Sequence, residues 1–430
     1  MRFKRSEFLA ITLMFFSMFF GAGNLIFPTI IGHVSGEYLI FGLVGFAITA
    51  IVIPIIGIIT VSKSEGMEPL ASRVSPYFGT FFTFSVLFAI GPGLAMPRTG
   101  ILPFEIGIKP LLSQNLGIWQ VVFTLIFFLT VYLLSIRPNK LVDIMGKIIT
   151  PTLLLLILIL FLSILVKQPL NLNVPAEAPN KTFFNAFLEG YQTLDALAAL
   201  NYGTVIVFTI QQYNVTDRQE QLSLAKKFGI LTGIILLLVY SVLSLIGALT
   251  PTQGFTNGAD IISSVGTNNL GFIGQIMIAA IFTLACLATC TGLTTSISRY
   301  FSQRFTKTTY KQWVIGLVAF SFLIANFGLD TLLTVSVPFL MSLYPVSLML
   351  IILGFFDYFN KNNNRVYKMV IPFVFVISII DVLITNNILP NIFAWIPLQD
   401  YGLAWLLPTL ILIAISTFIP KHKKDDTNLN

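Results

Sequence analysis

Long apolar runs separated by short polar segments recur along the whole chain. A helix needs about 20 apolar residues to cross the hydrocarbon core of a bilayer, and twelve segments meet this requirement. They are expected at residues 8–31, 38–61, 78–97, 117–136, 146–166, 183–211, 228–249, 271–298, 312–328, 331–356, 368–386 and 400–419. The pattern predicts an all-α integral membrane protein, because a membrane β-barrel would instead have short strands of alternating polarity.

Two of these spans are interrupted by residues that disfavour a regular helix. The first contains "MFFSMFFGAGNLIFPTIIG" at 14–32, and the sixth contains "EGYQTLDALAALNYG" at 189–203. The two spans run in opposite directions if the chain alternates sides, and interruptions at matching places predict a five-plus-five inverted repeat with a binding site near the membrane midplane. Glycine and proline are also common in membrane helices, where they make packing notches or kinks, so a purely structural reading stays open.

The whole chain, residues 1–430, is therefore expected to form one transmembrane domain. The first repeat covers about 8–166 and the second about 183–356, and two accessory helices follow at about 368–419. No connection between the spans is long enough to hold a separate soluble domain.

Composition and charge support a membrane protein and orient it. The sequence is 56% hydrophobic and 10% charged, with a mean hydropathy of +0.87, whereas soluble domains carry about 25% charged residues. With the N-terminus inside, 21 of the 25 lysines and arginines fall on the inner side, and only Arg98, Lys109, Lys167 and Lys181 fall outside. Because basic residues favour the cytoplasmic side, both termini are predicted to be cytoplasmic. The net charge of +7 then needs no nucleic-acid partner.

The sequence lacks the usual signs of an enzyme or of an ATP-driven pump. It has no glycine-rich phosphate-binding loop. Cys286 and Cys290 lie four residues apart in one span, and the only histidines are His33 and His422, so a disulfide or a resident metal is not expected. We expect no cofactor, and we expect any transport to be passive or driven by an ion gradient.

The two interruptions could bind a small charged solute. Free amides of "GAGN" at the start of a half-helix suit a carboxylate, and freed carbonyls suit a small cation. Asp195 inside a span costs about 2.5–3.5 kcal/mol, so it should face a cavity or a partner. The eighth span, with "TLACLATCTGLTTSIS", offers hydroxyl oxygens to a cation, although such hydroxyls often bond to the preceding helical turn. In the third span Arg98 and Glu105 could pair as an outer gate or form a plain interfacial salt bridge.

Four motifs resemble those of a known transporter family. They are "FFGAGNLIFP" at 19–28, "IGPGLAMPRTGILPFE" at 90–105, "GYQTLDALAAL" at 190–200 and "LACLATCTGL" at 284–293. Together they are similar to the branched-chain amino acid:cation symporters, the bacterial transport system II carriers, over essentially the whole chain. The resemblance implies a LeuT-type fold in a bacterial cell membrane. It also implies alternating access that brings leucine, isoleucine and valine into the cell with Na⁺ or H⁺.

The resemblance also implies roles for particular residues. The substrate would be bound by residues of the two interruptions, namely Ala22, Gly23, Asn24, Tyr191, Thr193, Asp195 and Ala196. Asp195 would pair with the ammonium group or carry a proton. A sodium ion would be bound by Gly21, Asn24, Thr289 and Thr294. Apart from the resemblance, the residues of the third span themselves suggest a gate that would contain Gly91, Arg98 and Glu105. The alternatives are a proton-coupled carrier of another small neutral amino acid or solute, or a channel.

Overall fold

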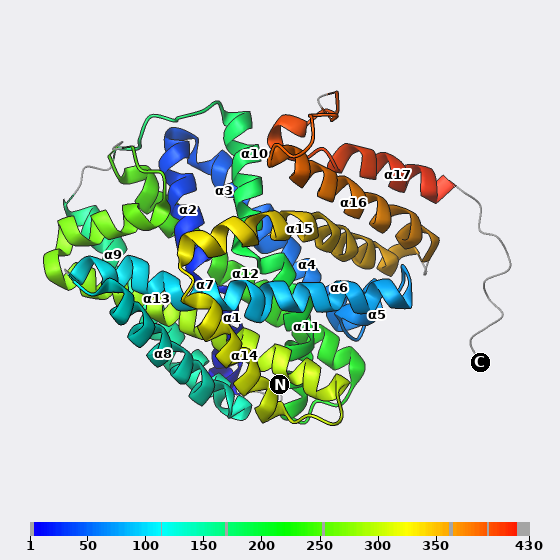
Figure 1. Cartoon of the computed structure of the whole chain (residues 1–430), viewed down its shortest axis with the longest axis horizontal. Coiled ribbons are helices and arrows are strands. Elements are labelled where there is room, and N and C mark those ends of the chain that lie inside the picture. Colours follow the sequence, from blue (N-terminus) through cyan, green and yellow to red (C-terminus); the bar gives the residue numbers. More distant parts are fainter. Residues whose placement is uncertain are drawn as a thin grey trace.

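The computed structural model describes residues 4–112, 114–167, 171–251, 254–360, 364–393 and 395–418, and within them the chain is helical without strands (Figure 1). The α-helices are α1 Arg5–Phe19, α2 Ala22–Ser35, α3 Leu39–Ala47, α4 Ile53–Lys63, α5 Met67–Ala71, α6 Pro76–Phe88, α7 Ala95–Pro103, α8 Leu116–Ser135, α9 Thr150–Lys167, α10 Pro179–Glu189, α11 Asp195–Gln212, α12 Arg218–Leu249, α13 Gly258–Arg304, α14 Tyr310–Ala325, α15 Leu329–Asn360, α16 Asn364–Thr385 and α17 Leu406–Phe418. The expected end of the last span at 419, and the basic residues Arg2, Lys361, Lys421, Lys423 and Lys424, lie outside the described residues, as does His422.

Short turns of tighter or wider helix continue or join many of the α-helices. The tighter 3₁₀ turns are η1 Gly36–Tyr38, η5 Lys109–Leu111, η6 Pro138–Lys140, η8 Gly190–Thr193 and η9 Gln399–Tyr401. The wider π turns are η2 Ile48–Val52, η3 Ala89–Gly93, η4 Phe104–Ile108 and η7 Val142–Ile149. Such turns often mark functional positions in a helix, and here η3 and η8 lie beside the cavities described below.

Each expected span overlaps one or more of these helices. Judged by length and composition, eight helices of the described chain could cross a membrane, or nine if the bent pair Pro179–Thr193 and Asp195–Gln212 forms one span. The apolar helices Tyr310–Ala325 and Leu406–Ile415, which correspond to the expected ninth and twelfth spans, are shorter. The chain is thus a multi-helix membrane protein, while the number of twelve crossings stays a prediction.

The expected end of the third span, at residue 97, is wrong. The helical segment continues through α7 and η4 to Leu111, so it covers Pro76–Leu111. Hydropathy places the boundary at Arg98 because arginine is costly in lipid. In the structure Arg98 is 9% exposed and lies inside the protein against cavities. A charge in this position therefore marks a cavity wall.

The expected start of the eighth span, at residue 271, coincides with a bend inside a longer helix. Helix α13 already begins at Gly258, and its only non-helical backbone is at Gly271, with φ 62° and ψ −140°. Only glycine adopts such angles without steric cost. The expected start at residue 271 is therefore wrong, because this residue is a bend within a helix that begins at Gly258.

Apolar side chains cover the outside of the bundle. Helix α8 lies at its edge (Figure 1) and exposes a row of large residues, namely Ile118, Leu125, Ile126, Leu129 and Leu133. Helices α16 and α17 lie side by side at the opposite edge (Figure 1). Polar side chains such as Asn24, Asp195 and Asn201 are instead buried in the centre. This arrangement suits a protein whose surroundings are hydrocarbon.

The centre of the bundle is built from the two interrupted segments and their neighbours. Helix α12 packs along α2, and α11 packs along α4. Helix α13 contacts α1, α2 and α7. These contacts place both interruptions in the protein interior.

Candidate functional site

The first interruption lies between α1 and α2. Helix α1 ends at Phe19 and α2 begins at Ala22, with Gly21 in an extended conformation between them. Asn24 reaches back across the break, and its Oδ1 accepts a hydrogen bond from the Gly21 amide at 3.1 Å. A β-carbon on Gly21 would lie 3.2 Å from the Thr289 hydroxyl oxygen. Glycine at this position therefore lets α13 approach the break.

The second interruption lies between α10 and α11. The 3₁₀ turn η8 follows α10, and the chain then bends by 45° into α11. Leu194, at the bend, has φ 64° and ψ 11°, which is a left-handed conformation. This conformation costs a non-glycine residue roughly 1–2 kcal/mol. The bend is therefore held by its surroundings, including the hydrogen bond that Thr193 Oγ1 donates to the Gly190 carbonyl at 2.8 Å.

A buried hydrogen-bond network joins the two interruptions. Asn24 Nδ2 donates to Asp195 Oδ2 at 2.6 Å, and the Tyr240 hydroxyl donates to the same oxygen at 3.3 Å. Asn24 Nδ2 is also hydrogen-bonded to the Tyr240 hydroxyl. Asp195 is 2% exposed, and no ion pair to it occurs within the described part of the chain. A buried carboxylate held only by neutral donors is poised to bind a cation or a proton.

The last carbonyls of α1 are capped by side chains from other helices. The Ser17 carbonyl accepts from Thr289 Oγ1 at 3.4 Å, and the Met18 carbonyl accepts from the Tyr202 hydroxyl at 3.2 Å. The final carbonyls of a helix have no partner within the helix itself. Several oxygens that could serve a hard cation therefore converge at the end of α1.

A small central cavity lies at the two interruptions. It has a volume of about 50 Å³. From the breaks it is lined by Gly21, Ala22, Gly23, Asn24, Thr193, Leu194 and Asp195. Arg98 and Thr99 of α7, Tyr202 of α11 and Thr289 of α13 complete its polar wall. The cavity combines a helix start, a carboxylate and hydroxyl groups, which is a setting for a small zwitterion and an ion.

Two larger cavities lie on either side of the central one, and we name each after one residue. The Glu189 cavity, of about 400 Å³, shares Arg98, Leu102 and Gln192 with the central cavity. The Arg299 cavity, of about 540 Å³, shares no lining residue with the central cavity. The neighbouring bond from Asn201 Nδ2 to Ser296 Oγ, at 2.6 Å, ties α11 to α13 at the wall of the Arg299 cavity. In this conformation the central cavity thus adjoins the Glu189 cavity.

Some residues expected at the site lie elsewhere. Tyr191 stacks on Tyr344 with 4.1 Å between ring centroids, and neither Tyr191 nor Ala196 lines the central cavity. Asp195, Ala198 and Tyr202 share the cavity-facing side of α11, and Ala196 is turned about 100° away from Asp195.

Thr294, expected at the sodium site, and Gly91, expected at the gate, do not line the central cavity. Thr294 donates its hydroxyl to the Cys290 carbonyl at 2.7 Å and lies beside Met96, so it does not reach the break. Gly91 faces Ile297 and is not part of the central cavity wall, although its neighbour Ile90 is.

The expected pairing of Arg98 with Glu105 is wrong. Glu105 Oε2 pairs with Lys109 Nζ at 2.6 Å, one helical turn away. Arg98 points to the interior, with its guanidinium 6.0 Å from the Phe27 ring centroid. Positions seven residues apart can share a helix face, but the segment passes through a π turn at Phe104–Ile108, which adds a residue to the turn. The two side chains are therefore not partners.

Sequence reasoning missed Tyr202, Tyr240 and Glu189. Each tyrosine lies in a largely apolar stretch with one or two other polar residues, "NYGTVIVF" at 201–208 and "LLLVYSVL" at 236–243. A buried tyrosine hydroxyl usually finds a hydrogen-bond partner, and this signal could have identified both. Glu189 stands at the edge of the second interruption, and its cavity partner Arg98 is distant in sequence.

Solved structures with the same fold are transporters. The chain aligns with Mhp1, a nucleobase-cation-symport-1 family transporter, with a TM-score of 0.58 and 13% identity, over 95% of this chain and 93% of that one. It aligns with MhsT in complex with L-phenylalanine with a TM-score of 0.52 and 16% identity, over 95% and 97% of the two chains. At these identities the likeness concerns the fold alone, which this chain shares with Mhp1 and MhsT.

Sequence relatives identify the family. Branched-chain amino acid permease BrnQ of Bacillus subtilis is 36% identical over 416 residues, which cover 94% of each chain. The branched-chain amino acid transport system 2 carrier protein of Pseudomonas aeruginosa is 33% identical over 426 residues, which cover 96% of each chain. These relatives are permeases and carriers, so the family is one of transport proteins and not of enzymes. The family model for branched-chain amino acid transport proteins matches residues 4–423, and the chain belongs to this family.

Proposed function

We propose that this protein takes up leucine, isoleucine and valine by alternating access, coupled to Na⁺ entry. The observation that carries the proposal is the direct contact between the two interrupted helices, through Asn24 and Asp195. The names of the relatives support branched-chain amino acids as the substrates. One methylene in an apolar pocket is worth only about 1–3 kcal/mol, so the three amino acids should compete for one site.

In this proposal the substrate is bound at the central cavity. Its carboxylate lies at the start of α2, against the amides of Ala22 and Gly23. Its ammonium group lies near Asp195, with Asn24 and Thr193 beside it. The cavity has to widen for leucine, since 50 Å³ is well below the 300–1,000 Å³ typical of ligand pockets. Binding would therefore go together with a movement of the helices that line it.

The sodium ion is proposed to bind at the end of α1. Thr289 and the Ser17 carbonyl supply oxygen ligands, with Gly21 and Asn24 on the other side of the break. A hydroxyl that now donates a proton to a carbonyl can turn and offer its lone pairs to a cation. Because Asn24 also contacts Asp195, an ion that orders the break would favour substrate binding.

Proton coupling is the second candidate, and one observation favours it. Asp195 is buried among neutral partners, and a carboxylate in such a place can take up a proton in place of a cation. The channel alternative is not supported, because the family consists of permeases and carriers and the central cavity is small.

The orientation is proposed from the basic residues. Arg218 and Arg299 line the Arg299 cavity and belong to the predicted cytoplasmic side, whereas Arg98 belongs to the predicted outer side. The Arg299 cavity would then face the cytoplasm, and the Glu189 cavity would face outward in a bacterial cell membrane.

The test is uptake of labelled leucine into proteoliposomes that contain the purified protein. Uptake is compared under an inward Na⁺ gradient, under an inward H⁺ gradient and without a gradient, with unlabelled isoleucine and valine as competitors. We expect accumulation that requires Na⁺ and is inhibited by both competitors. Accumulation with H⁺ alone would replace sodium coupling by proton coupling at Asp195, and lack of leucine uptake under all three conditions would refute the substrate.

A further inference from the structure

The two large cavities differ in how their charges are satisfied. In the Arg299 cavity, Glu68 accepts a hydrogen bond from the Tyr300 hydroxyl at 2.6 Å and pairs with Arg304 at 3.4 Å. Arg218 of the same cavity donates to the Ser62 carbonyl at 2.7 Å and lies 3.7 Å from Glu65. Glu65, Glu68 and Arg218 therefore already have charged partners within the protein. Arg299 has no ion pair among the described residues and lies over the Phe208 ring.

The Glu189 cavity contains one side chain of each charge without such partners. Arg98 and Glu189 both line it. Within the described part of the chain neither side chain has an ion pair or a side-chain hydrogen bond, and the guanidinium of Arg98 only lies over the Phe27 ring. Arg98 is 9% exposed, and Glu189 is half-buried. A charge withdrawn from water costs several kcal/mol unless it is paired.

The remaining wall of this cavity combines uncharged polar residues, Gln192, Thr256 and Asn257, with large apolar side chains. Ile26, Phe27 and Ile30 of α2 form one side, and Leu329 and Val337 of α15 form another. A ligand that satisfies the whole cavity needs an anionic group for Arg98, a cationic group for Glu189 and an aliphatic body. A zwitterionic aliphatic amino acid has these three features.

Volume also favours this cavity as a binding place in the present conformation. Its 400 Å³ lies within the range of about 300–1,000 Å³ found for small-molecule pockets, whereas the central cavity offers about 50 Å³. The cavity can thus hold an amino acid while the central cavity is closed.

We propose that the Glu189 cavity is a second binding site for a zwitterionic aliphatic amino acid, with the carboxylate on Arg98 and the ammonium group on Glu189. The identity of the ligand rests on the proposed function. Arg98 also lines the central cavity, so it can hold the carboxylate until the ligand moves inward and the carboxylate passes to the start of α2. The site would load the carrier before the central cavity opens.

The test is the number of labelled leucine molecules that bind to each purified, detergent-solubilised chain at saturation. We expect two for the wild type and one for Glu189→Gln. Glu105→Gln is the matched control, because Glu105 lines none of the three cavities and is paired with Lys109. This control should bind two. Ile30→Trp, which fills the cavity and keeps both charges, should bind one.

Ligands that lack one charge test the chemistry. Leucinol has no carboxylate for Arg98, and 4-methylpentanoate has no ammonium group for Glu189. An excess of either compound should therefore not displace the labelled leucine molecule that is bound in the Glu189 cavity. One leucine per chain in the wild type, unchanged in Glu189→Gln, would overturn the second site and leave the transport proposal intact. That outcome would mean that Arg98 and Glu189 serve only to pair with each other in another conformation. Failure of the wild type to bind any leucine would instead refute the proposed substrate.

Discussion

Asn24 is the residue on which the junction of the two interrupted helices depends. Its side-chain oxygen caps the start of α2 through the Gly21 amide, and its side-chain nitrogen donates to Asp195. An alanine would lose both bonds, and an aspartate would keep only the first. These two functions of one amide explain why a polar residue stands in an apolar segment.

Tyr240 fixes the orientation of the Asp195 carboxylate. Tyr240→Phe removes one donor from this carboxylate at little change in volume. A hydrogen bond to a charged group is worth about 1.5–3 kcal/mol. We therefore expect the KM for leucine uptake to rise about tenfold or more, with the maximal rate changed much less. Initial rates over a range of leucine concentrations in proteoliposomes measure both quantities.

The control for this substitution is Tyr77→Phe. Tyr77 is 90% exposed and lines none of the three cavities. Loss of the Tyr77 hydroxyl should leave the KM for leucine uptake unchanged. An unaltered KM in Tyr240→Phe would show that the Asp195 carboxylate does not need this donor for leucine binding.

Among single residues, sequence reasoning identified those with unusual chemistry for a membrane span. Asn24 and Asp195 were predicted at the site, and the structure brings them within 2.6 Å of each other. Thr294 was expected beside Thr289, but positions five residues apart in a helix point in different directions. Glu189 and Arg98 could not be matched from sequence, because they are far apart along the chain and only the tertiary fold brings them to one cavity.

At the scale of helices, Leu194 determines the bend between α10 and α11. Because the backbone of Leu194 is left-handed, replacement by glycine should be more stable than replacement by alanine, the reverse of the order in a regular helix. In a regular helix, glycine is about 1 kcal/mol less stable than alanine. At residue 194 we expect Leu194→Gly to be more stable than Leu194→Ala by about 1 kcal/mol, since glycine adopts this conformation without steric cost.

Thermal unfolding of the two purified variants measures this difference. Both replacements remove the leucine side chain, so loss of apolar contacts largely cancels in the comparison. The same pair of substitutions at Leu238, an exposed position inside α12, should show the ordinary order. A higher melting temperature for Leu194→Ala than for Leu194→Gly would mean that the bend is not held in the left-handed conformation.

The positions of the interruptions were predictable from sequence, whereas some helix boundaries were not. Glycines with a neighbouring polar residue marked both breaks, because such residues cannot be explained by contact with lipid. The third span is predicted to end at residue 97, because hydropathy cannot distinguish the charge of Arg98 in an internal cavity wall from a charge in water. The π turns are likewise invisible to a simple helical period.

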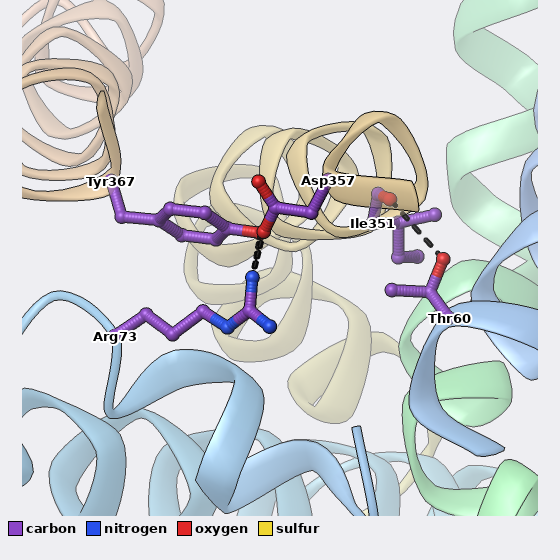
Figure 2. Close-up of polar contacts among 5 residues, drawn as sticks. All are labelled: Thr60, Arg73, Ile351, Asp357 and Tyr367. Atoms are coloured by element: carbon purple, nitrogen blue, oxygen red, sulfur yellow. Dashed lines mark hydrogen bonds and ion pairs between the residues drawn. The ribbon is translucent and has the colours of Figure 1, made fainter. Parts of the chain in front are cut away.

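At the scale of the whole molecule, α15 and α16 are tied to the first half of the chain by a polar cluster (Figure 2). Arg73, in the connection between α5 and α6, pairs with Asp357 of α15 and donates to the Tyr367 hydroxyl at 3.1 Å. The Tyr367 hydroxyl in turn donates to Asp357 at 2.6 Å. Nearby, Thr60 of α4 donates to the Ile351 carbonyl at 3.4 Å (Figure 2). The cluster therefore holds three distant segments together.

Asp357→Asn tests the contribution of this cluster. The side chains of Arg73 and Asp357 are 23% and 12% exposed, so the substitution leaves a largely buried arginine without its counter-charge. We expect a loss of about 1–3 kcal/mol in the free energy of unfolding, seen as a lower melting temperature. Asp143→Asn is the matched control, because its pair with Lys147 is exposed and should leave the melting temperature unchanged. Equal melting temperatures for Asp357→Asn and the wild type would contradict a stabilising role of the cluster.

The central claim is that the two interrupted helices together form the amino-acid site. The most direct measurement is the initial rate of labelled leucine uptake into proteoliposomes by Asn24→Asp, which keeps the oxygen that caps α2 but loses the donor to Asp195. Asn326→Ala is the control, since Asn326 contacts Thr124 away from the cavities. We predict at least a tenfold lower rate for Asn24→Asp, at equal amounts of folded protein, and a wild-type rate for Asn326→Ala. A wild-type rate for Asn24→Asp would contradict the account and place the substrate elsewhere in the bundle.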